Sequence, residues 1–79
     1  VKPDPTVVLD ILKLANVRKE DVLYVGDSGV DMQTAANAGV TACGVTWGFR
    51  PRTELEEFAP QYITETAEEI KRLISADKV

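Results

Sequence analysis

The stretch that decides the fold is Val22-Leu23-Tyr24-Val25-Gly26-Asp27-Ser28-Gly29-Val30-Asp31. Its first four residues are a short β-favouring apolar run, and Gly26 ends that run. An apolar run that stops at a glycine predicts a strand buried on both faces. A helix is predicted to follow over residues 30–38, with Gly39 at the left-handed position after its last turn. The stretch therefore predicts a strand followed directly by a helix.

The flanking sequence continues this alternation of helix and strand. Apolar residues at helical spacing predict a helix over residues 5–16, for which Asp4 would be the N-cap. A second buried strand is predicted over residues 41–45 and a third over residues 62–64. An alternation of this kind indicates an α/β fold built on a parallel sheet with right-handed crossovers.

Two capping boxes predict the remaining helices. Thr53 with Glu56 predicts a short helix over residues 53–58, and Thr66 with Glu69 predicts a last helix from 67 to about 76. With helices before, between and after the strands, we expect a three-layer, doubly wound parallel sheet with helices on both faces.

The composition excludes several classes of active site. The 79 residues include no histidine and one cysteine, Cys43, in the middle of a predicted strand. A Ser-His-Asp triad, a Cys-His pair, an internal disulfide and a histidine- or cysteine-rich zinc site are therefore excluded within this chain. Cys43 is expected to be a small core residue.

The charge and the single methionine bear on partners and on the extent of the protein. Thirteen acidic residues against nine basic ones give a net charge of -4, which argues against a nucleic-acid or anionic-membrane partner. No apolar run approaches the roughly 20 residues of a membrane span. We expect a cytoplasmic protein. Because Met32 is the only methionine, Val1 is not a translational start, and the chain is expected to be part of a longer protein.

Two carboxylates stand on either side of the turn that follows the first strand. Asp27 comes directly after the strand, and Asp31 lies in the first turn of the next helix. Ligands of parallel α/β sheets bind beyond the carboxyl ends of the strands. A cation between the carboxylates would relieve their repulsion, and Mg²⁺ prefers such oxygen ligands. The alternative is that Asp31 only complements the helix dipole and Asp27 only forms the turn.

Further candidate residues lie at the same edge of the predicted sheet. Free N–H groups at the start of the helix are expected to attract phosphate, which puts Ser28 in the vicinity of a phosphate or substrate. In the loop over residues 46–52, Trp47 could roof a pocket or pack on the end of the sheet. Arg50 could meet an anionic substrate or be solvated. Lys2 is either a solvated lysine or a residue at the end of a strand upstream of this chain.

The order of these motifs resembles a known family. Lys2-Pro3-x-Pro5 is followed, about twenty residues later, by Val25-Gly26-Asp27-Ser28-x-x-Asp31-x-x-x-Ala35-x-x-Ala38-Gly39. This pattern resembles the third and fourth motifs of haloacid-dehalogenase superfamily phosphatases. Within the superfamily, Gly-Asp-Ser and the loop Val45-Thr46-Trp47-Gly48-Phe49 resemble the phosphoglycolate phosphatases. The chain would then be the C-terminal part of one Rossmann-like hydrolase core domain, residues 1–79.

The resemblance implies an activity and a role for each matching residue. It implies a Mg²⁺-dependent phosphatase that hydrolyses a small phosphomonoester, such as phosphoglycolate, through an aspartyl-phosphate. Lys2 would steady the nucleophile and the transferred phosphoryl group, Asp27 would bind Mg²⁺, and Asp31 would hold the metal or its waters. The expected partners are a small phosphorylated metabolite and the N-terminal part of the same protein.

The resemblance also shows what this chain lacks. The family's nucleophile motif, Asp-x-Asp, is absent, as are its second motif and its cap domain. We therefore expect the chain alone to be inactive, and its first strand to leave an unpaired edge where the nucleophile strand would pair. Two alternatives remain, namely a phosphomutase of the same superfamily and a non-catalytic Mg²⁺-binding α/β module.

Overall fold

A computed structural model describes residues 4–48 and 50–76 of the chain, so that Lys2 and Phe49 lie outside the described residues. None of the helices in those ranges is long and apolar enough to cross a membrane. The elements, in chain order, are α1 (Thr6–Ala15), the 3₁₀ turn η1 (Lys19–Asp21), β1 (Leu23–Gly26), α2 (Gly29–Ala38), β2 (Thr41–Val45), α3 (Arg52–Glu56), β3 (Tyr62–Thr64) and α4 (Ala67–Ala76).

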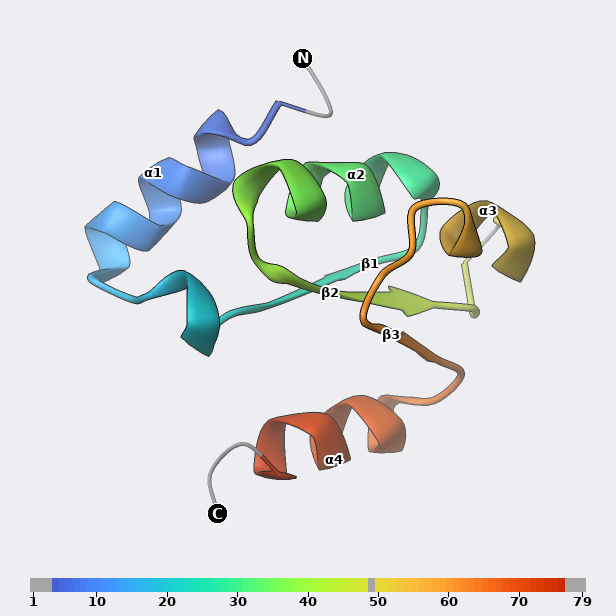
Figure 1. The fold of residues 1–79 in the computed structure, drawn as a ribbon. Coiled ribbons are helices and arrows are strands. Elements are labelled where there is room, and N and C mark those ends of the chain that lie inside the picture. Colours follow the sequence, from blue (N-terminus) through green and yellow to red (C-terminus); the bar gives the residue numbers. More distant parts are fainter. Residues whose placement is uncertain (1–3, 49, 77–79) are drawn as a thin grey trace.

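The three strands form one parallel sheet in the order β1-β2-β3. The register pairs Gly26 of β1 with Gly44 of β2, and Val45 of β2 with Thr64 of β3. Figure 1 shows α1 and α2 on one side of the sheet and α4 on the other. The predicted three-layer α/β arrangement is therefore confirmed, with all three strands ending at the same edge.

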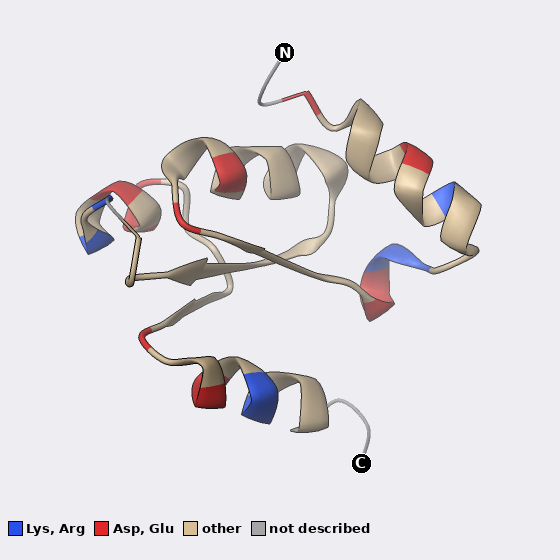
Figure 2. Cartoon of the chain, turned by 180° about the vertical axis from the view of Figure 1, so that it is seen from behind, with Lys and Arg blue, Asp and Glu red and all other residues tan. Residues whose placement is uncertain are grey.

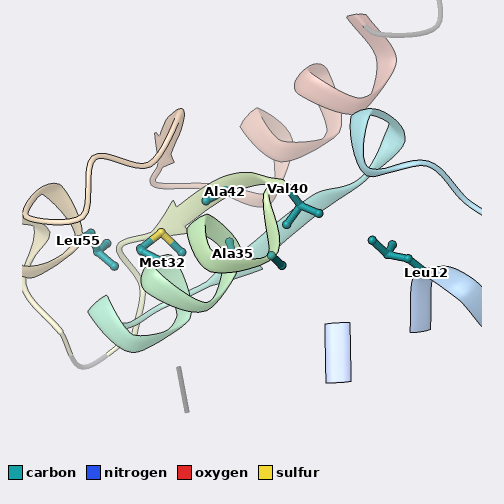
Figure 3. Close-up of a cluster of buried hydrophobic side chains, with 7 residues drawn as sticks. Leu12, Met32, Ala35, Val40, Ala42 and Leu55 are labelled. Atoms are coloured by element: carbon teal, nitrogen blue, oxygen red, sulfur yellow. The ribbon is translucent and has the colours of Figure 1, made fainter. Parts of the chain in front are cut away.

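The core lies between α2 and the sheet. It extends from Leu55 of α3, past Met32 and Ala35 of α2, to Leu12 of α1 (Figure 3). Ala35 is fully buried and Met32 is 1% exposed. The small alanine side chain lets α2 lie close to the sheet, because a larger residue at that position would need space that the core does not have.

The two faces of β1 differ in burial, which corrects one expectation. Tyr24 packs against the α2 side of the sheet, whereas Val25 points to the opposite side and keeps 42% of its surface exposed. On that opposite side α4 packs against β3; Val25 is exposed and Leu23 is half-buried, and among the described residues no strand pairs with the outer edge of β1. The prediction of a strand buried on both faces is confirmed for β2 and wrong for β1.

Local hydrogen bonds test the predicted helix starts. Asp4 Oδ1 accepts hydrogen bonds from the Thr6 hydroxyl (2.6 Å) and the Thr6 N–H (2.9 Å), and these lower the pKa of the Asp4 carboxyl. The Asp4 side chain therefore accepts the N–H of the first residue of α1, although the N-cap position itself is Pro5, one residue later than predicted. At the start of α4, Thr66 Oγ1 accepts from the Glu69 N–H at 3.2 Å, which is one half of the predicted capping box, whereas Glu69 Oε1 accepts from the Glu65 N–H at 3.1 Å.

The other capping box does not form. Helix α3 begins at Arg52, one residue earlier than predicted, and Thr53 lies inside it. Glu56 accepts a hydrogen bond from Arg52 Nε at 3.4 Å instead of reaching back to Thr53. The reason is that Pro51, in extended conformation, precedes the helix and sets its start.

The burial of Leu55 predicts a loss of stability when its side chain is shortened. Its side chain is fully buried, within the cluster formed with α2 and the sheet. In the complete protein, Leu55→Ala is expected to lower the free energy of unfolding by about 2–5 kcal/mol, measured by urea denaturation. Leu55→Met, which conserves volume, should cost less than about 1.5 kcal/mol. Equal stability of Leu55→Ala and the unsubstituted protein would contradict this packing.

Candidate functional site

The candidate site begins where β1 ends and α2 begins. The Asp31 side chain lies over the backbone of Gly26, so closely that a Cβ on Gly26 would overlap the Asp31 Cβ and lie 2.8 Å from its Cγ. Asp31 Oδ2 also accepts a hydrogen bond from the Asp27 N–H at 3.2 Å. The carboxylate of Asp31 is therefore turned back toward the end of β1, next to the backbone of Asp27.

Ser28 holds this turn in shape. It is the N-cap of α2, with φ of -133° and ψ of 161°, and its Oγ accepts a hydrogen bond from the Asp31 N–H at 3.2 Å. The hydroxyl thereby satisfies one of the N–H groups that a helix start leaves unpaired. The structure thus gives the Ser28 side chain a capping role, and the expectation that Ser28 lies in the vicinity of a substrate stays a prediction.

The loop after β2 reaches the same turn. A Cβ on Gly48 would lie 2.5 Å from Asp27 Oδ2 and 2.7 Å from the Asp27 Cβ, so the Asp27 side chain lies directly against the Gly48 backbone. This approach requires a glycine, because any larger residue would displace the carboxylate or the loop. Nearby in the loop, Trp47 is 55% exposed, so packing on the end of the sheet is not its main environment.

Helix α3 contributes a residue that the sequence reasoning missed. Glu54 Oε2 accepts a hydrogen bond from the Gly29 N–H, the first of α2, at 2.8 Å. Its other oxygen pairs with Arg50 at 3.7 Å, and the Arg50 side chain remains 60% exposed. The expectation of free N–H groups at the start of α2 is therefore wrong for Gly29. The Arg50–Glu54 spacing of four residues was a visible signal for the ion pair, but not for the contact with Gly29.

These contacts gather acidic groups at one edge of the molecule. Figure 2 shows acidic positions where β1 meets α2 and on the neighbouring α3. In the ranges 4–48 and 50–76, however, no three acidic, histidine or cysteine side chains converge as a metal-binding group. Asp27 and Asp31 are a partial donor set of hard oxygens. Mg²⁺ fits such a set, because it is usually held by one or two carboxylates together with waters and substrate phosphates.

The structure thus brings together most of the residues predicted for the site. Asp27, Ser28 and Asp31 form the β1–α2 turn, and the loop with Trp47 and Arg50 follows the neighbouring strand β2. Lys2 lies outside the described residues. Two hollows, of about 680 Å³ and 700 Å³, lie elsewhere. One is between α1 and η1, and the other is lined by η1, the starts of the strands and α4.

Comparison with known proteins identifies the family. The model of the haloacid dehalogenase-like hydrolase family matches residues 1–45, which include the β1–α2 turn and β2. The chain therefore belongs to the haloacid dehalogenase-like hydrolases, as its motifs indicated.

The chain is similar in sequence to individual phosphatases of this family. The chain is 35% identical over 69 residues to phosphoglycolate phosphatase 1 of Pseudomonas aeruginosa, covering 87% of this chain and 25% of that protein. It is 31% identical over 75 residues to the pyrophosphatase PpaX of Bacillus mycoides, covering 95% of this chain and 35% of that protein. The chain thus spans about a quarter to a third of the length of these relatives.

Solved structures agree with this assignment. A protein from Lactobacillus delbrueckii, provisionally named phosphoglycolate phosphatase, superposes with a TM-score of 0.85 at 34% identity, covering 94% of this chain and 31% of that one. A protein from Thermotoga maritima, provisionally named beta-phosphoglucomutase, superposes with a TM-score of 0.77 at 28% identity, covering 92% and 34%. The fold and the family are therefore established together.

The capping role of Ser28 gives a prediction for the site. Ser28→Ala removes the acceptor for the Asp31 N–H, and we expect it to lower the free energy of unfolding of the complete protein by about 1 kcal/mol. Ser28→Asn, which keeps a good N-cap, should unfold at nearly the same urea concentration as the unsubstituted protein. An equal loss of unfolding free energy in Ser28→Ala and Ser28→Asn would contradict the capping role of the hydroxyl.

Proposed function

We propose that this chain is the C-terminal part of a Mg²⁺-dependent phosphatase that hydrolyses a small phosphomonoester, such as phosphoglycolate. The observation that carries the proposal is the pair Asp27 and Asp31 at the carboxyl end of β1, where Asp31 is turned back onto the strand end. Membership of the hydrolase family and the likeness to a phosphoglycolate phosphatase support it. We further propose that the protein is cytoplasmic, consistent with its single, unpaired and buried cysteine.

Each residue has a proposed role in this chemistry. Asp27 would bind Mg²⁺ directly, and Asp31 would bind the metal or its waters while its carboxylate stays fixed over Gly26. Bound Mg²⁺ would neutralise charge on the phosphoryl oxygens. Lys2 would contact the nucleophile and the transferred group, a role that follows from the family motif alone. Trp47 and Arg50 would lie near the substrate.

The remaining machinery would come from outside these 79 residues. In the proposed reaction, an aspartate upstream of this chain attacks phosphorus, the P–O ester bond breaks, and the leaving oxygen takes a proton from a second upstream aspartate. Water then hydrolyses the aspartyl-phosphate to release phosphate. This chain would supply metal ligands and positive charge, because phosphoryl transfer depends mainly on positioning and charge neutralisation.

A phosphomutase is a second candidate, because one solved structure that the fold resembles is named for that activity. A mutase would use the same metal site but return the phosphoryl group to a sugar phosphate instead of releasing it to water. Inorganic phosphate release from a phosphomonoester, without an isomerised product, distinguishes the phosphatase from the mutase.

Substitution of Asp27 tests the metal role. In the complete protein, Asp27→Asn is expected to reduce Mg²⁺-dependent release of phosphate by roughly 100-fold or more, since it removes charge next to the transferred phosphoryl group. Asp10→Asn, at an exposed position of α1, is the control and should retain full activity. Full activity of Asp27→Asn would overturn the metal assignment. A Mg²⁺-binding module without turnover is indicated if the unsubstituted protein binds Mg²⁺ and hydrolyses nothing.

A second prediction follows because the proposed nucleophile lies outside residues 1–79. Residues 1–79 alone, assayed with Mg²⁺ and an aryl phosphate, are expected to release no more product than a protein-free blank, because the nucleophile is absent. The complete protein, assayed in parallel, is the positive control. Turnover by residues 1–79 clearly above the blank would contradict the proposed nucleophile.

A further inference from the structure

Helix α3 is attached to the start of α2 by two kinds of contact. The first is the hydrogen bond from the Gly29 N–H to Glu54 Oε2, 2.8 Å long and partly buried. The second is packing, since a Cβ on Gly29 would lie 3.1 Å from Glu54 Cγ and 2.6 Å from Cε2 of Phe58, which follows α3. These contacts join segments 25 residues apart in sequence, and they do so at the first residue of the helix that carries Asp31.

The body of α3 is fixed independently of Glu54. Leu55 is fully buried, and a Cβ on Gly44 of β2 would lie 3.2 Å from Leu55 Cδ1. Because β2 and Leu55 hold α3 in place, Glu54 is presented to α2 from a rigid support. A carboxylate held in this way can restrain the Gly29 N–H, and with it the turn in which Ser28 and Asp31 lie.

The same carboxylate also touches the other loop of the site. While Oε2 accepts from Gly29, Oε1 lies 3.7 Å from Arg50 Nη1. Glu54 therefore links the β1–α2 turn to the loop that follows β2. Glu56, also in α3, makes a comparable ion pair with Arg52, which is likewise four residues away, at 3.4 Å. Glu56 thus provides a natural comparison that has the ion pair without the contact to α2.

We propose that Glu54 is a positioning residue, which holds the β1–α2 turn through the Gly29 N–H so that Asp27 and Asp31 share one Mg²⁺. The inference rests on the proposed function. Residues that orient the ligands of a metal typically change its affinity by 10–100-fold when they are removed, although they do not touch it. The hydrogen bond is the essential part of this role, whereas the ion pair with Arg50 is secondary because it is 3.7 Å long and its Arg50 side chain is 60% exposed.

The test measures Mg²⁺ affinity by calorimetry and amide hydrogen exchange at Gly29 in the complete protein. Glu54→Ala should weaken Mg²⁺ binding about tenfold and speed Gly29 exchange, because it removes the acceptor. Glu54→Gln should restore both, since its amide oxygen can accept the same hydrogen bond although it cannot pair with Arg50. Glu56→Ala, the matched control, should change neither value.

Two results would overturn the positioning role. The first is Mg²⁺ affinity in Glu54→Ala equal to that of Glu56→Ala. The second is that Glu54→Gln loses as much Mg²⁺ affinity as Glu54→Ala. That result would assign the effect to the charge of Glu54 and not to its hydrogen bond. A wrong proposed function would give another result. The unsubstituted protein would bind no Mg²⁺, while Glu54→Ala would still speed amide exchange at Gly29.

Discussion

The side chain of Asp31 lies directly over the backbone of Gly26, and the contact exists because Gly26 has no Cβ. That single approach sets the geometry of the candidate site. It allows Asp31 to accept the Asp27 N–H, and it brings a carboxylate from the helix to the end of the strand. Two carboxylates at the end of a parallel strand repel each other unless a cation lies near them. The approach of Asp31 to Gly26 is therefore the contact on which the geometry of the candidate site depends.

The neighbouring elements enclose this turn from two directions. Gly48, after β2, lies against the Asp27 side chain, and Glu54 of α3 accepts the first N–H of α2. Both contacts depend on the parallel register, which brings the ends of β1 and β2 to the same edge. The site is thus built from local turn chemistry at β1–α2 and from tertiary contacts made by the β2–α3 segment.

The sequence predicted the local part and missed most of the tertiary part. The order of the helices and strands and the cap at Thr66 follow from periodicity and nearby polar residues, and the structure agrees. Glu54 could not be recognised, because its partner Gly29 is 25 residues away and only folding brings them together. The exposure of Val25 was also missed, since an apolar run does not reveal which face a distant helix covers.

The central claim is that Asp27 and Asp31 lie at a metal site in the complete protein. The most direct measurement replaces Mg²⁺ with paramagnetic Mn²⁺ and records the broadening of backbone amide signals. The account predicts strong, saturable broadening for residues 26–31 and for Gly48, which lies against Asp27, with much weaker broadening in α4, and displacement by excess Mg²⁺. Broadening centred elsewhere, or none at residues 26–31, would contradict it.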